Sequence, residues 1–235
     1  MVDWRACLLA LGLGVFADGT SASECRLALV LALDVSSSVD AKEYDLQRVG
    51  LAAALDSEDV RHAILAGGPG YVALSVFEWS GFRQHDLKLD WSILDSQSAI
   101  TDAAAVLAKM QRGHDEFPTS MGAAMAYGLA LLQKGPQCRR RVIDVSGDGV
   151  NNYRYGPRAA YRHFPFQEVT VNGLVILGDD PEVLPYYRTN VMHGQDAFLM
   201  TANGFDQFQD AMTRKLYREI SNFLIGGDPS NGQKG

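Results

Sequence analysis

A carboxylate and several hydroxyls follow directly on the first apolar strand-like segment, in the run Asp34-Val35-Ser36-Ser37-Ser38. Asp34, Ser36 and Ser38 alternate in this run and offer hard oxygen donors, which suit Mg²⁺ rather than a soft metal. The same residue types also form turns and cap helices. The five residues alone do not distinguish a metal site from a turn. The distinction depends on the strands and helices predicted around them.

The segment in front of this run indicates where it lies in the fold. Leu27 to Leu33 is an unbroken hydrophobic stretch. It is too short to span a membrane and is typical of a parallel strand that is buried on both faces. Asp34 would then stand at the carboxyl end of the strand, which is the edge of an open α/β sheet where ligands bind.

The rest of the chain alternates predicted strands and helices. Strand-like segments are expected at 71–79, 141–145, 169–177 and 196–201, with 85–91 as an edge strand. Apolar periodicity and capping residues predict helices at 40–55, 60–65, 97–110, 123–132 and 205–224, and a short helix and loop at 181–191. This order predicts an α/β fold: a doubly wound, mostly parallel central sheet with one antiparallel edge strand and helices on both faces.

Two further oxygen donors fall at comparable places. Thr119 stands just before the predicted helix 123–132, and Asp148 follows the predicted strand 141–145 between two glycines. Because the carboxyl ends of parallel strands meet at one edge of a sheet, both donors are expected beside the first run. The candidate metal ligands are therefore Asp34, Ser36, Ser38, Thr119 and Asp148.

These motifs together resemble a known family. Asp-x-Ser-x-Ser, a distant Thr within Thr-x-Met-Gly-x-Ala, and Asp-Gly after a later strand are similar to the von Willebrand factor type A (vWA) domain. In that family the five positions form the metal-ion-dependent adhesion site (MIDAS). The resemblance covers 27–224, and the segments 146–152 and 170–174 also resemble a bacterial exported branch of unassigned function. It implies an architecture and a site, but no named process.

The resemblance also implies a binding mode. Three neutral hydroxyls and two carboxylates would leave a bound Mg²⁺ (with Mn²⁺ or Ca²⁺ as alternatives) incompletely neutralised and open to a further oxygen. In the family that oxygen comes from an Asp or Glu of a protein partner. We therefore expect a metal-dependent adhesion or scaffold module.

The amino-terminal segment has the composition of an export signal. An apolar run at 6–16 follows Arg5, and Thr20-Ser21-Ala22 provides small residues for cleavage. Asp3 offsets the charge of Arg5, which leaves an uncleaved anchor as the alternative. We expect a signal peptide at 1–22, a vWA-like domain at 25–225 and a disordered tail at 226–235. No other segment reaches membrane-span length, so the mature protein is expected in the periplasm or outside the cell.

Cys7 would leave with the signal, and the remaining pair, Cys25 and Cys138, indicates a disulfide in an exported protein. Cys25 lies nine residues before Asp34, and Cys138 lies ten before Asp148. In the family's strand order the two strands are adjacent and parallel. The resemblance therefore implies that both cysteines lie at the sheet edge opposite the metal.

Composition narrows the function classes. The chain has 235 residues, of which 47% are hydrophobic, and this suffices for one α/β domain. The net charge is −7, and the basic run 139–141 leads into an apolar strand, so nucleic acid is not an expected partner. The histidines lack metal-ligand spacing and are interpreted as surface or loop residues; they are His62, His85, His114, His163 and His193.

Three functions remain as hypotheses. A binding module without enzymatic activity is favoured, because the chain has no Gly-x-Ser-x-Gly, His-Glu-x-x-His or phosphate-binding Gly-x-x-x-x-Gly-Lys motif. A phosphatase-like, Mg²⁺-dependent hydrolase is the alternative, although Ser36 occupies the position of the second aspartate in phosphoaspartate enzymes. A subunit working with a separate ATPase is the third. Asn151 and Asn152 are interpreted as a turn, with orientation of the metal loop as the alternative.

Overall fold

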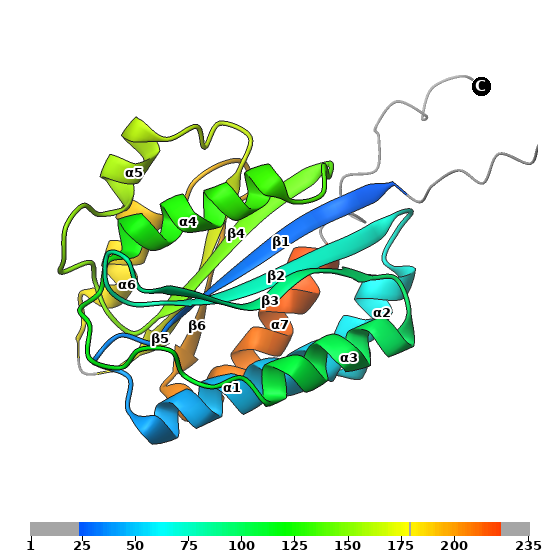
Figure 1. The fold of residues 1–235 in the computed structure, drawn as a ribbon, viewed down its shortest axis with the longest axis horizontal. Coiled ribbons are helices and arrows are strands. Elements are labelled where there is room, and N and C mark those ends of the chain that lie inside the picture. Colours follow the sequence, from blue (N-terminus) through cyan, green and yellow to red (C-terminus); the bar gives the residue numbers. More distant parts are fainter. Residues whose placement is uncertain (1–23, 179, 222–235) are drawn as a thin grey trace, which may run out of the picture.

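The computed structural model describes residues 24–178 and 180–221. The predicted signal peptide at 1–22 and the predicted tail at 226–235 lie outside the described residues. No helix within the described part of the chain is long and apolar enough to cross a membrane. The described residues form one α/β unit with a central sheet between two layers of helices (Figure 1).

The sheet has six strands in the order β3-β2-β1-β4-β5-β6. Every neighbouring pair is parallel except β2 and β3, which are antiparallel. The predicted sheet, with one antiparallel edge strand, is therefore confirmed. The strands are β1 (Cys25–Asp34), β2 (Tyr71–Trp79), β3 (His85–Leu94), β4 (Arg140–Gly147), β5 (Thr170–Leu177) and β6 (Leu199–Asn203).

Helices cover both faces of the sheet (Figure 1). One face packs against α1 (Ala41–Asp56), α2 (Glu58–Ala66), α3 (Gln97–Ala108) and α7 (Phe208–Ser221). The other packs against α4 (Met121–Lys134), α5 (Pro157–His163), α6 (Val183–Tyr186) and the π-helix η1 (Tyr187–Val191). Successive residues of a strand point to opposite faces, so Leu27 of β1 lies in the first core and Ala28 in the second. All ten residues of β1 are buried.

The structure departs from the sequence prediction at three elements. The seven-residue helix α5 was not predicted, because it is too short to show a clear apolar period. Strand β6 occupies 199–203 rather than 196–201. The predicted single helix from 205 begins as a 3₁₀ turn, η2 (Phe205–Gln207), before α7, and the segment after Ser221 lies outside the described residues.

The end of the sheet opposite the carboxyl edge of β1 is tied together covalently and by hydrogen bonds. A disulfide joins Cys25 to Cys138, as the resemblance implied. The buried Arg26 donates to the carbonyls of Ala63 (2.8 Å) and Ile64 (2.6 Å) near the end of α2, and to that of Ile220 (3.3 Å) near the end of α7. Carbonyls near a helix end lack some of their intrahelical partners, and Arg26 supplies donors there, although the Ala63 carbonyl also accepts the Gly67 amide hydrogen.

Charged residues also lie between the sheet and α7. Lys215 of α7 forms an ion pair with Asp144 of β4 at 2.8 Å, and both side chains are buried. Glu219 accepts hydrogen bonds from Arg140 (2.8 Å) and from Asn172 (2.5 Å). The helix is therefore fixed to β4 and β5 by polar contacts as well as by its apolar face, because each buried charge has an oppositely charged or hydrogen-bonding neighbour.

Candidate metal centre

The structure brings the five predicted ligands together at the carboxyl edge of β1 and β4. Ser36 Oγ lies 3.3 Å from Ser38 Oγ, and Thr119 Oγ1 donates to Ser36 Oγ at 3.2 Å. Ser38 Oγ donates to Asp148 Oδ1 at 2.9 Å. The Ser36 amide donates to Asp34 Oδ1 at 2.8 Å. Three segments far apart in the sequence thus form one continuous chain of oxygens.

The spacing of these oxygens fits a divalent cation. Mg²⁺ binds oxygen ligands at about 2.0–2.1 Å in an octahedron, so neighbouring ligand oxygens lie about 2.9 Å apart. The contacts between Ser36, Ser38, Thr119 and Asp148 measure 3.3, 3.2 and 2.9 Å. A cation could therefore replace these hydrogen bonds after small side-chain movements, with carboxylate and hydroxyl donors of the type that Mg²⁺ takes.

Asp34 supplies a second indication that a cation fits. Its side chain is fully buried, and Oδ2 has no hydrogen-bond partner among the described residues. Burial raises the pKa of the Asp34 carboxyl to about 7, and the charge of Asp148 adds to this rise. A carboxylate buried without compensation is costly, so a nearby cation would stabilise its charged form.

Arg112 holds the loop that carries Asp34, Ser36 and Ser38. Its Nη2 donates to three carbonyls of that loop: Val35 O at 2.9 Å, Ser36 O at 3.1 Å and Val39 O at 2.8 Å. Its guanidinium carbon lies 5.8 Å from the centre of the Tyr44 ring on α1. This role of Arg112 is not predictable from the sequence, because no local pattern shows that a side chain binds a loop more than seventy residues away.

Asn151 and Asn152 hold the segment that carries Thr119. Asn152 Oδ1 accepts the Thr119 amide hydrogen at 2.9 Å, and Asn151 Oδ1 accepts that of Met121 at 2.9 Å. In return, Thr119 O accepts the amide hydrogens of Asn152 (3.1 Å) and Tyr153 (3.2 Å). The structure therefore favours the alternative interpretation of these two residues, in which they orient the loops that carry the candidate ligands.

Three of the five candidate ligands, Ser38, Thr119 and Asp148, line an open cleft of about 580 Å³. Residues from the carboxyl end of β5 and from the start of η2 complete its wall. Glu43 and Asp180 add two more carboxylates to its wall. The cleft gives an external group access to the candidate metal centre, and it is strongly acidic.

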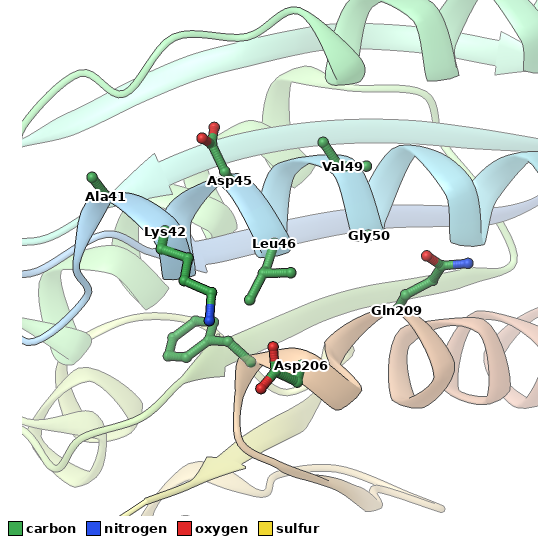
Figure 2. Close-up of a pocket in the computed structure, with 9 residues that line it drawn as sticks. Ala41, Lys42, Asp45, Leu46, Val49, Gly50, Asp206 and Gln209 are labelled. Carbon is green, nitrogen blue, oxygen red and sulfur yellow. The ribbon is translucent and has the colours of Figure 1, made fainter.

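A separate groove of about 450 Å³ runs between α1 and the start of α7. Figure 2 shows Lys42 extending from α1 toward Asp206, with Leu46 and Val49 along the same helix. None of the five candidate ligands lines this groove, so it is distinct from the candidate metal centre.

Other metal arrangements are absent from the described part of the chain. No group of three or more His, Cys, Asp or Glu side chains is placed there to hold a metal ion. The prediction that the histidines lie on the surface or in loops is wrong for His85, which is half-buried at the start of β3 and stacks on Tyr127. His193 does lie in a loop, between η1 and β6, where it is half-buried and stacks on Tyr161.

Solved structures share this fold. The von Willebrand factor type A structure from Catenulispora acidiphila has a TM-score of 0.56 and 16% identity, and the match covers 84% of this chain and 42% of that one. Proximal thread matrix protein 1 from the mussel byssus, with a zinc-occupied MIDAS motif, has a TM-score of 0.59 and 15% identity over 84% and 46%. The pilus adhesin SpaC from Lactobacillus rhamnosus GG has a TM-score of 0.59 and 15% identity over 86% and 31%. The chain thus spans less than half the length of these three proteins.

The six-stranded sheet, its helical layers and these structural matches define a von Willebrand factor type A fold. The chain belongs to the family described as "Protein of unknown function (DUF1194)", whose model matches residues 24–224. No curated protein matches the chain.

Proposed function

We propose that this protein is an exported, metal-dependent protein-binding module without enzymatic activity. In this proposal a divalent cation, Mg²⁺ with Mn²⁺ or Ca²⁺ as alternatives, binds to Asp34, Ser36, Ser38, Thr119 and Asp148. A partner protein supplies an Asp or Glu carboxylate as a further ligand. The module then acts in adhesion or as a scaffold.

The observation that carries this proposal is the composition of the oxygen chain at the mouth of the cleft. Its members Ser36, Ser38 and Thr119 are neutral hydroxyls, and Asp148 at its end and Asp34 beside it are the two carboxylates. A divalent cation bound there would keep affinity for an external anionic oxygen. The net charge of −7 would otherwise repel an acidic partner, so the cation would provide the local attraction.

The comparisons support this proposal at the level of the fold. One similar structure is a pilus adhesin, and another is a thread matrix protein with zinc in its MIDAS motif. Export is supported by the Cys25–Cys138 disulfide, because disulfides persist in oxidising compartments. Mass spectrometry of native protein should then find a mature chain that starts near Ser23. An intact Met1 in a cytosolic fraction would contradict export.

Calorimetry with Mg²⁺ and Mn²⁺ tests the metal site. Asp34→Ala should abolish metal binding while far-UV circular dichroism stays unchanged, because the core of the sheet does not depend on this carboxylate. Unchanged metal affinity in Asp34→Ala would remove the basis of the proposal.

Thr119→Ala tests the coupling of metal and partner. Thr119 is one ligand of several, so its loss should weaken partner binding more than it weakens metal binding. A pulldown from envelope extract in Mg²⁺, repeated in EDTA and with Asp34→Ala, identifies the partner for this test. Binding that persists in EDTA and in Asp34→Ala would place the interface elsewhere on the domain. Steady turnover of a phosphate ester that disappears in Asp34→Ala would instead establish a hydrolase.

A further inference from the structure

A third cavity, of about 600 Å³, lies beside the candidate metal centre. Residues from the turn between β2 and β3, from the segment just before Thr119 and from the loop after Asn152 form its wall. We call it the arginine–aromatic cavity, because its lining includes Phe82, Arg83, Phe117, Pro118, Tyr153 and Arg154.

Among the described residues, the two arginines of this cavity have no acidic partner. Arg83 and Arg154 are exposed, and within residues 24–178 and 180–221 neither forms an ion pair. The guanidinium carbon of Arg154 lies 5.6 Å from the centre of the Phe82 ring and 5.3 Å from that of Tyr153. Stacking on aromatic faces positions a guanidinium while its N–H donors remain free for a carboxylate.

The backbone of Arg154 is strained. Its φ angle is 59°, in the left-handed region, which costs a residue with a side chain about 1–2 kcal/mol. Strain of this kind persists where the surrounding structure imposes it, often at binding sites. The strained position and the unpaired charge therefore fall on the same residue.

The cavity and the candidate metal centre are close enough for one peptide to contact both. Phe117 and Pro118 precede the candidate ligand Thr119 by two residues and one residue, and the amide of Tyr153 donates to Thr119 O at 3.2 Å. Consecutive Cα atoms lie 3.8 Å apart, so this part of the cavity wall starts within about 4–8 Å of Thr119. That is the span of one or two residues of an extended peptide.

Charge differs on the two sides of the candidate metal centre. The arginine–aromatic cavity lies toward β2 and β3, whereas the cleft on the side of β5 and β6 carries Glu43, Asp148 and Asp180. A second negative charge on the partner would be repelled by the acidic cleft and attracted by Arg83 and Arg154.

We propose that the arginine–aromatic cavity binds a second acidic side chain of the same protein partner, within about three residues of the carboxylate that reaches the metal. This inference rests on the proposed function. The partner segment would then carry two acidic residues at a fixed spacing, and the cavity would determine both the choice of sequence and the direction of the bound peptide.

Selection from a random peptide display library tests this inference. The immobilised full chain is exposed to the library in Mg²⁺, and bound peptides are eluted with EDTA. We expect the eluted sequences to share one Asp or Glu and a second acidic residue at a constant offset. Selection on the double variant Arg83→Gln/Arg154→Gln should keep the first acidic residue and lose the second. Arg162→Gln, an exposed arginine of α5 outside the cavity lining, is the matched control.

Fluorescence polarisation with a synthetic peptide of the selected sequence measures how much Arg83 and Arg154 contribute to peptide affinity. The double variant should bind it about three- to tenfold more weakly, in line with exposed or partly exposed charge pairs. A peptide with the second acid changed to its amide should bind the wild type and the double variant equally. Arg154→Gly should also lose the preference for the acidic peptide over its amide form. This variant should be no less stable than the wild type, because glycine relieves the strain at φ 59°.

The outcomes separate the two proposals. Sequences that share one acid with no second preference, or that keep the second acid on the double variant, would overturn the inference and leave the proposed function intact. Eluted sequences with an aromatic residue in place of the second acid would also overturn the inference and leave the proposed function intact. If no eluted peptides share an acid, or if Asp34→Ala selects the same sequences, the proposed function and this inference both fail.

Discussion

At the scale of single residues, Asp34 links the fold to the candidate chemistry. It is the last residue of β1, it is fully buried, and one of its oxygens accepts the Ser36 amide hydrogen while the other accepts none. In the metal-free protein the burial raises the pKa of this carboxyl to about 7. Without a cation, the residue most central to the site is thus also a source of instability.

The stability of the metal-free protein should depend on pH through this residue. An unfolded Asp ionises near pH 4, whereas folded Asp34 keeps its proton until about pH 7. Folding therefore takes up a proton in this window, and stability falls as the pH rises through it. Asp34→Asn cannot ionise, so in EDTA at pH 8 we expect it to be more stable than the wild type, by up to about 4 kcal/mol.

Urea unfolding at pH 5 and pH 8 in EDTA measures this difference. The wild type should lose more stability than Asp34→Asn between the two pH values, and Mg²⁺ should restore stability to the wild type alone. Equal pH dependence of the two proteins would show that Asp34 is ionised in the folded state throughout this range.

Gly147 leaves space for the same carboxylate. A Cβ at this position would lie 2.7 Å from Asp34 Oδ2 and 2.8 Å from Tyr187 Oη. Gly147→Ala should therefore displace Asp34, lower the free energy of unfolding by about 1–3 kcal/mol, and weaken metal binding in calorimetry. Gly178→Ala is the control, because Gly178 lines the cleft in front of the candidate metal centre but, among the described residues, a Cβ there meets nothing within 4 Å. Equal effects of the two substitutions would contradict this explanation.

At the scale of elements, the site depends on how three loops are held at the ends of β1 and β4. The hydroxyls of the first loop take part in the oxygen chain, while its carbonyls bind the Arg112 side chain. The second and third loops are tied to each other through Thr119, Asn151 and Asn152. The candidate ligands therefore take their positions from contacts between loops as much as from the strands.

Arg112→Met should loosen the first loop and leave three carbonyls without this donor. We expect metal affinity to fall about 10-fold or more, as it does when groups that orient metal ligands are removed, and stability to fall by about 1–3 kcal/mol. Arg61→Met is the matched control, since Arg61 bonds to Gln97 and Thr101 of α3, away from the site. Arg61→Met should lower the free energy of unfolding, whereas calorimetry should show an unchanged metal affinity. An unaltered metal affinity in Arg112→Met would contradict this role.

Local sequence predicts that the candidate ligands gather at one edge of the sheet, because each of them stands at or beside the end of a recognisable element. Asp34 ends an unbroken apolar strand, and Thr119 precedes a helix rich in small residues. The contact of Arg112 with the first loop joins segments that no local pattern relates. Lys215 and Glu219 illustrate the same limit in α7: a charged residue in a helical period is expected to face solvent, yet tertiary partners bury both.

At the scale of the whole molecule, the predicted α/β order is confirmed. The prediction is wrong for elements whose limits are set by tertiary packing and not by their own sequence. β1 is predictable because both of its faces are buried and its residues are uniformly apolar. β6 is an edge strand with only one buried residue, so its sequence marks its limits poorly. The short helix α5 is positioned by its packing against α4 and η1, and its own sequence shows no clear helical periodicity.

The disulfide should stabilise the domain without contributing to the metal site. It closes a loop with a sequence separation of 113 residues, for which loop-closure entropy predicts about 4–5 kcal/mol as an upper figure. Cys25→Ala/Cys138→Ala should lower the free energy of unfolding by up to this amount in urea titrations. Calorimetry should show unchanged metal affinity, because Cys25 and Asp34 are the first and last of the ten residues of β1 and lie about 30 Å apart. A large loss of metal affinity would show that the two ends of the sheet are coupled.

This layout has a mechanical consequence. The described chain begins beside Cys25 and ends in α7, whose Ile220 carbonyl binds Arg26, so both ends lie at the disulfide edge, far from the candidate metal centre (Figure 1). Tension between a captured partner and the start of the domain would run along β1, parallel to both neighbouring strands. Under such shear the force is shared by all backbone hydrogen bonds of β1, which therefore do not break one after another. The Cys25–Cys138 disulfide also links β1 covalently to the segment before β4. The domain should therefore outlast the proposed metal–carboxylate contact under load, so that a partner held by it is released before the domain unfolds.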